Sequence, residues 1–264
     1  MTLAHGLFLF AVATIGGALN TVAGGGSFLT FPSLIFVGIS PVVANATNSV
    51  AIWPAGVAGA FAYRHEMRNM GRTLAVLGIA SFLGGLLGAI LLLLTPDTAF
   101  MSLVPWLLLA ATLLFNFGGL FTARMRKSPL EMSDRPQGPT TVSFVLQFVI
   151  GVYGGYFGGG MGIMMLATLA MMGMTNILTM NAVKTVLTTV INGIAIVAFI
   201  VAGKVIWGPA LLMAVGATGG GYFGAFASRK VAPKWMRRFV LVVAWAMTAY
   251  FFIKQYAGHF LPKH

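Results

Sequence analysis

The chain alternates long apolar segments with short polar loops. Apolar segments of full membrane length lie near residues 5–22, 42–63, 73–95, 100–122, 140–157, 177–202, 207–228 and 235–258. Uncharged stretches of about 20 residues are typical of transmembrane helices. Two further apolar segments, near 28–38 and 161–173, are too short for a hydrocarbon core about 30 Å thick, because a helix rises only ~1.5 Å per residue. The pattern predicts an all-α polytopic membrane protein with two half-helices, or two short spans whose ends are buried in protein.

Composition and charge support this class. Of the 264 residues, 58% are hydrophobic and 8% are charged, whereas a soluble domain carries about a quarter charged residues. The absence of cysteine excludes disulfides and thiolate chemistry. A net charge of +12 could indicate nucleic-acid binding, but the basic residues gather in a few loops between apolar segments. Membrane topology explains that distribution better, so we expect a lipid bilayer and no nucleic acid as partner.

The two halves of the chain resemble each other. Three groups match in order, at a spacing of 134 residues for the first and 136 for the others: Gly24–Gly26 with Gly158–Gly160, Asn45-Ala46 with Asn181-Ala182, and Gly84-Gly85 and Gly88-Ala89 with Gly220-Gly221 and Gly224-Ala225. The sequence therefore predicts a first transmembrane repeat over 1–123, a cytoplasmic linker over 124–139 and a second transmembrane repeat over 140–264.

Basic residues predict the orientation of these repeats. Dense groups of Lys and Arg lie in 64–72, 124–135 and 229–238. If each short apolar segment counts as a crossing, each half crosses five times and all three loops share one side. Positive loops mark the cytoplasmic side, and an odd number of crossings inverts one half relative to the other. We therefore expect inverted repeats in a bacterial-type cytoplasmic (inner) membrane, with both termini outside.

The two glycine triplets are candidate substrate-binding elements. Each ends an apolar run and precedes a short apolar segment. Glycine lets the backbone leave the helix, and such a break must line a cavity or be buried in protein. The N-terminus of the following short helix favours an anion, and matching breaks in two repeats are typical of transporter binding sites. The alternative is close helix packing by small residues, which we favour for Gly84/Gly88 and Gly220/Gly224.

Lys184 is the only charged residue well inside a predicted span. Residues 181, 184, 188 and 192 recur at helical spacing and form one polar stripe. An ionisable residue within the membrane is a functional candidate; the alternative is a lysine whose long stem reaches water. The predicted substrate-binding residues are Asn20, Thr21, Gly24, Gly25, Gly26, Ser27, Asn45, Thr47, Asn48, Gly158, Gly159, Gly160, Asn181, Lys184, Thr188 and Asn192.

Chemistry other than binding has little support. The histidines, His5, His65, His259 and His264, fall near termini or loops. They cannot form an intramembrane metal site or proton relay, and no Ser/His/Asp arrangement can be placed at a common depth. We therefore expect no enzyme activity, no catalytic or metal-binding residues and no cofactor.

Residues 16–32, Gly-Gly-Ala-Leu-Asn-Thr-Val-Ala-Gly-Gly-Gly-Ser-Phe-Leu-Thr-Phe-Pro, resemble the sulfite exporter, or TauE/SafE-like, family of membrane transporters. Residues 44–48, the glycine-rich stretch 151–162 and residues 181–184 fit the same family. The resemblance implies transport of sulfur-containing oxyanions or organosulfonates without identifying one. Composition and spacing alone indicate a secondary transporter with an anion site.

These observations together predict a secondary transporter that moves a small sulfite-like anion by alternating access. The anion would bind between the two glycine breaks, with Asn, Thr and Ser donors and Lys184 as countercharge. The rival hypotheses are a passive anion channel on the same scaffold, a membrane enzyme and a structural membrane subunit. The sequence leaves the anion, the direction of transport, the coupling ion and the oligomeric state open.

Overall fold

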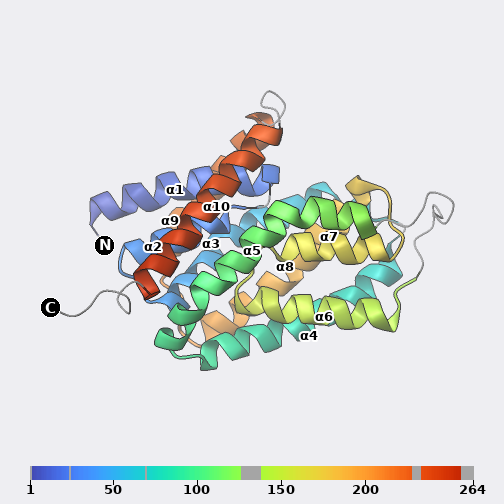
Figure 1. The fold of residues 1–264 in the computed structure, drawn as a ribbon, viewed down its shortest axis with the longest axis horizontal. Helices are drawn as coiled ribbons and strands as arrows, with labels where there is room; N and C mark the ends of the chain where they lie inside the picture. The colour runs from blue at the N-terminus through green and yellow to red at the C-terminus, as the bar shows by residue number, and fades with distance from the viewer. Residues whose placement is uncertain (1, 24, 69, 126–137, 228–232, 257–264) are drawn as a thin grey trace. The chain divides into compact units, whose positions relative to one another are not determined.

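A computed structural model describes residues 2–23, 25–68, 70–125, 138–227 and 233–256 (Figure 1). Within those ranges the chain is helical and contains no strand. The helices are α1 (Leu3–Ala23), α2 (Ser27–Phe36), α3 (Pro41–Ala62), α4 (Gly71–Leu94), α5 (Asp97–Met125), α6 (Thr141–Tyr156), α7 (Met161–Met171), α8 (Ile177–Val201), α9 (Trp207–Ala227) and α10 (Pro233–Tyr256). This confirms the all-α prediction. Most of the predicted linker lies outside the described residues.

Helix lengths distinguish full spans from short segments. Among the described residues, five stretches are long and apolar enough to cross a membrane: Leu3–Asn20, Gly71–Leu94, Asp97–Gly118, Leu178–Val201 and Arg238–Tyr256. Helices α3 and α9 have 22 and 21 residues but are not among these five. Helices α2 and α7, with 10 and 11 residues, confirm the short segments that follow the glycine triplets.

Helix α6 is shorter than the full-length span predicted for 140–157. It has 16 residues, so its length of about 24 Å is less than the core thickness of about 30 Å. Thr140 and Ser143 form a capping box at its start. A left-handed glycine, Gly158, follows its end. Both boundaries are therefore set by local signals, and α6 joins α2 and α7 as a short apolar helix.

The helices form two compact units, and each unit draws on both halves of the sequence. Unit 1 comprises Met1–Ile52, Leu93–Leu113 and Lys204–His264, and unit 2 comprises Trp53–Leu92 and Leu114–Gly203. In unit 1, α1 packs against α2, α9 and α10. In unit 2, α6, α7 and α8 pack against one another. Helices of one repeat thus pack with helices of the other, so the packing units differ from the sequence repeats.

Small residues bring helix backbones into contact in the same way in both units. In unit 1, a Cβ added at Gly220 of α9 would meet the backbone carbonyl of Thr14 in α1. In unit 2, a Cβ added at Gly84 of α4 would meet the backbone carbonyl of Phe148 in α6. Thr14 and Phe148 are 134 residues apart, which is the repeat spacing of these helices. The close-packing interpretation of Gly84 and Gly220 is confirmed.

Repeat-related residues also contact each other directly. In unit 1, the hydroxyls of Thr112 and Thr248, which are 136 residues apart, hydrogen-bond at 3.1 Å. In unit 2, the indole Nε1 of Trp53 donates to the carbonyl oxygen of Thr189, also 136 residues away, at 3.0 Å. Each unit therefore contains one hydrogen bond between residues at corresponding positions of the two sequence halves.

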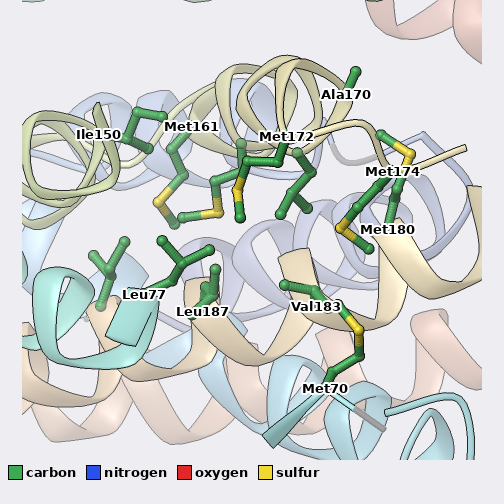
Figure 2. Close-up of a cluster of buried hydrophobic side chains, with 13 residues drawn as sticks. Met70, Leu77, Ile150, Met161, Ala170, Met172, Met174, Met180, Val183 and Leu187 are labelled. Carbon is green, nitrogen blue, oxygen red and sulfur yellow. The ribbon is translucent and has the colours of Figure 1, made fainter. Parts of the chain in front are cut away.

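Methionine is the most frequent residue type in the core around α7 in unit 2 (Figure 2). The unbranched, polarizable thioether fills irregular gaps between short and broken helices. The buried core residues are Met70, Leu77, Ile150, Met161, Met165, Leu169, Ala170, Met172, Met174, Met180, Val183, Leu187 and Ile191. Helix α7 is therefore packed within protein, as a half-helix in a membrane must be.

Candidate functional site

The break between α6 and α7, in unit 2, is built on left-handed glycines. The backbone N–H groups of Phe157 and Gly158 both donate to the carbonyl of Tyr153, at 2.9 and 3.2 Å. Gly158 has φ 84° and Gly160 has φ 78°, a conformation that glycine adopts without a Cβ penalty. The chain therefore leaves one helix and enters the next within a few residues.

The N-terminus of α7 begins directly at this break. Gly160 is its N-cap, and no side chain caps it. The first N–H groups of a helix have no intrahelical acceptor and carry a partial positive charge. The start of α7 therefore presents backbone donors of the kind that bind anions.

The side chain of Lys184 lies along this first turn of α7. A Cβ added at Gly162 would stand 3.2 Å from Cδ and 3.9 Å from Cε of Lys184. Glycine at position 162 therefore leaves room for the lysine stem. The cation is brought to the same end of α7 that already carries the positive end of the helix dipole, an arrangement that favours a bound anion.

The ammonium group of Lys184 is held by an uncharged partner. Its Nζ donates to the side-chain oxygen of Asn181 at 3.0 Å, one helical turn away on α8. Both side chains are half-buried. Of the acids in the described residues, Asp97 belongs to unit 1, where it accepts from the backbone N–H of Val42 at 2.9 Å, and Glu66 lies in the turn after α3. The predicted position of Lys184 within a helix and beside a second polar residue is confirmed.

The other members of the stripe occupy different surroundings. The side-chain oxygen of Asn192 would lie 4.0 Å from a Cβ added at Gly158, so α8 passes beside the break. The hydroxyl of Thr188 donates to the carbonyl of Thr185 at 2.9 Å, within the helix. The structure thus brings Lys184 and Asn192 to the α6–α7 break, and Asn181 accepts a hydrogen bond from Lys184. The Thr188 hydroxyl instead donates to the backbone of its own helix.

The first break, in unit 1, has a different construction. Gly26, the N-cap of α2, has φ −58°, an ordinary right-handed value. A Cβ added there would meet the carbonyl of Gly16 and would lie 2.9 Å from Cβ of Asn20, both in α1. A Cβ added at Gly25 would meet Val240 of α10. Close packing accounts for both glycines.

Three further predicted residues near this break have limited description. Ser27 is the first residue of α2. Thr21 belongs to α1, but its side chain lies outside the described part of the structure. Gly24 also lies outside the described residues.

The polar residues of α3 are buried in unit 1. Asn45, Thr47 and Asn48 are 2%, 0% and 4% exposed. The hydroxyl oxygen of Thr47 accepts from the backbone N–H of Ile206 at 3.2 Å. The side-chain oxygen of Asn48, which stands at the repeat position of Lys184, is buried without a hydrogen-bond partner. A buried acceptor left without a hydrogen bond costs about 1–3 kcal/mol.

Two residues of the second break were not predicted from the sequence. The hydroxyl of Tyr153 donates to the carbonyl of Gly159 at 2.6 Å, and Gly162 accommodates Lys184. Both lie in the glycine-rich stretch 151–162, which the sequence pattern identified. That pattern did not indicate the contacts that these two residues make. Within the described part of the chain, no group of three or more His, Asp or Glu side chains is placed to hold a metal ion.

Comparison with known proteins gives a consistent result. A "Probable membrane transporter protein" of Haemophilus influenzae is 29% identical over 256 residues, which cover 96% of each chain. "Probable membrane transporter protein ORF9" of a Sinorhizobium species is 28% identical over 243 residues, covering 91% of this chain and 89% of that protein. "Probable membrane transporter protein YfcA" of Escherichia coli K12 is 28% identical over 243 residues, covering 91% and 87%.

No solved structure matches the chain significantly. The family-level match nevertheless spans nearly all of the sequence. Residues 9–251 match the family described as Sulfite exporter TauE/SafE, which includes both glycine breaks and the Lys184 stripe. The chain is a membrane transporter that belongs to the sulfite exporter TauE/SafE family.

Proposed function

We propose that the protein is a secondary transporter for a small sulfur-containing oxyanion or an organosulfonate. The anion would bind at the α6–α7 break of unit 2, against the start of α7 and beside Lys184. One observation carries this proposal. The Lys184 stem packs over Gly162 in the first turn of α7, and the Lys184 ammonium group donates its hydrogen bond to the neutral amide of Asn181.

The expected attraction is large enough to matter. Unit charges 4 Å apart attract by about 4 kcal/mol at an effective dielectric near 20, before desolvation is subtracted. A helix N-terminus contributes about 0.3–1 kcal/mol more. A sulfonate or sulfite group offers several oxygen acceptors, so one anion can use Lys184 and the backbone donors of α7 together.

The membrane arrangement proposed here is two inverted repeats in the cytoplasmic membrane, with both termini outside. The basic residues support this orientation, because five crossings in each half would place all three basic loops on one side, which positive charge marks as cytoplasmic. The repeat-spaced contacts Thr112–Thr248 and Trp53–Thr189 are consistent with two-fold related repeats. Transport would proceed by alternating access, as in other transporters with broken helices. No chemical conversion of the anion is involved.

The polar residues of α3 in unit 1 remain predicted substrate contacts. Asn48 is the strongest of them, because its buried side-chain oxygen lacks a partner. It would accept a hydrogen bond from a protonated or N–H-bearing group.

Ligand stabilisation tests the proposal directly. The purified protein would be heated in detergent with sulfite, sulfate, thiosulfate, taurine or sulfoacetate, at constant ionic strength. We expect at least one of these anions to raise the melting temperature, because a ligand that binds only the folded state stabilises it by RT ln(1 + [L]/Kd).

Lys184 variants then locate the site. Lys184→Met keeps the bulk of the stem and removes the charge, so the affinity for that anion should fall about tenfold or more. Lys184→Arg should be intermediate, because the charge survives but the donor geometry changes. Lys204→Met is the matched control, since Lys204 is exposed in the loop between α8 and α9. Unchanged affinity in Lys184→Met would exclude the countercharge role, and unsaturable flux in proteoliposomes would favour a channel.

A further inference from the structure

We propose that Tyr153 is a positioning residue that orients the backbone of the α6–α7 break toward the anion. The inference rests on the proposed function, because it concerns the same half-site as Lys184. Tyr153 does not contact the anion in this proposal. It fixes the direction of one peptide group that does.

Tyr153 is bonded to both sides of the break. Its backbone carbonyl accepts the N–H groups of Phe157 and Gly158, at 2.9 and 3.2 Å. Its side-chain hydroxyl reaches forward and donates to the carbonyl of Gly159 at 2.6 Å. The ring packs edge-on against Phe157, with centroids 6.3 Å apart. One residue therefore ends α6 and also holds the peptide that leads into α7.

The Gly159 carbonyl determines where the next N–H points. In a trans peptide, the carbonyl of one residue and the N–H of the following residue point in opposite directions. A Gly159 carbonyl held by Tyr153 therefore turns the N–H of Gly160 away from Tyr153. It also removes a partial negative charge from the anion's side of this peptide.

This peptide needs such a tether. Its neighbours Gly158 and Gly160 are both left-handed, and Gly159 has no side chain either. Glycine visits many backbone conformations, so an untethered peptide could turn its carbonyl toward the anion and repel it. The Tyr153 hydroxyl disfavours that conformation.

The corresponding position of the first break carries no hydroxyl. The repeat position of Tyr153 is Leu19, which is buried and has no hydrogen-bonding side chain. Of these two corresponding positions, only the one in the unit that carries Lys184 has a hydroxyl. The Tyr153 hydroxyl and the Lys184 ammonium group occur in the same unit. We therefore assign Tyr153 to the anion site and not to helix packing alone.

Tyr153→Phe tests the inference, because it removes the hydroxyl and keeps the ring. We expect the affinity for the stabilising anion to fall about fivefold, which is the range for loss of one net hydrogen bond. Tyr250→Phe is the control: its ring packs on Phe36 and Phe251 in unit 1, and its affinity should match the wild type. The melting temperature without anion is measured for both variants.

The outcomes separate the possible roles. A lower melting temperature with unchanged anion affinity makes Tyr153 a structural residue and overturns the inference. If Lys184→Met loses affinity while Tyr153→Phe does not, the inference fails and the proposed function survives. If neither variant loses affinity, the proposed site itself is wrong.

A second measurement does not depend on the variant folding. In wild-type protein labelled with ¹⁵N-glycine, the amide signal of Gly160 should shift as the anion is added, because its N–H binds the ligand. A Gly160 signal that stays constant at saturating anion would also overturn the inference.

Discussion

The two glycine breaks share a sequence motif but differ in physical construction. At the first break, Gly26 has ordinary right-handed geometry and fits against the backbone of α1. At the second, Gly158 and Gly160 have positive φ, and the peptide between them is tethered by Tyr153. The first break needs glycine because a side chain would collide with the neighbouring helix. The second break needs glycine because its backbone adopts positive φ.

The residues around the breaks differ in the same sense. Position 184 is a lysine whose ammonium group contacts an uncharged amide, and its repeat counterpart, position 48, is a buried asparagine with an unpaired oxygen. The α6–α7 break therefore offers positive charge and backbone donors, whereas α3 carries a neutral acceptor at the position corresponding to Lys184.

Opposite orientation of the two repeats gives the largest expected contrast. The loops after α3 and α8 occupy corresponding positions, so inversion places His65 inside and Lys204 outside. Both residues are exposed, and the chain has no native cysteine. Lys204→Cys should react with an impermeant thiol reagent added to whole cells, whereas His65→Cys should react only after permeabilisation. Equal labelling of both from outside would disprove inversion.

Alanine at the first break should act on stability. Gly26→Ala places a methyl group against the carbonyl of Gly16, and such overpacking costs about 1–3 kcal/mol. We expect a lower melting temperature with anion affinity retained in the protein that remains folded. Gly71→Ala, where nothing lies within 4 Å of the added Cβ, is the control. A normal melting temperature for Gly26→Ala would contradict the packing role.

A larger side chain at position 162 should weaken anion binding. Gly162→Val pushes against the Lys184 stem, whose Cδ lies 3.2 Å from the added Cβ. Displacing the ammonium group should reduce anion affinity about threefold to tenfold, because Coulomb attraction falls with distance. Gly78→Val in α4 is matched, since its added Cβ meets nothing within 4 Å. Isothermal titration of both variants gives the comparison, and equal affinities would separate Gly162 from the site.

Removal of the Asn48 amide should have the smallest effect. Its oxygen is buried and unpaired, so Asn48→Leu should leave the ligand-free protein as stable or up to about 1 kcal/mol more stable. If Asn48 contacts the substrate, the same variant should lose part of the ligand-induced shift for an N–H-bearing substrate such as taurine. Asn116→Leu, on α5 in unit 2, serves as a comparison. Clear destabilisation without ligand would indicate a structural role for Asn48.

The amino-acid sequence alone determined the helical membrane class and the short helices. Runs of apolar residues and glycine triplets are local signals, so the helices at Ser27–Phe36 and Met161–Met171 could be predicted from them. The polar stripe around Lys184 followed from helical spacing, because residues three and four apart share a face. The motif in residues 16–32 also indicated the transporter family.

Only the tertiary structure decided which helices pack together. Membrane helices are apolar on most faces, so the pattern does not distinguish a face toward lipid from a face toward protein. The packing of α1 with α9 in unit 1 is therefore not evident from the sequence. For the same reason Gly26 and Gly160 look alike in sequence. Gly26 is required because a neighbouring helix packs against it, and Gly160 because its backbone has a positive φ. The hydroxyl of Tyr153 and the space at Gly162 depend on three-dimensional geometry, which a linear pattern of residue types does not encode.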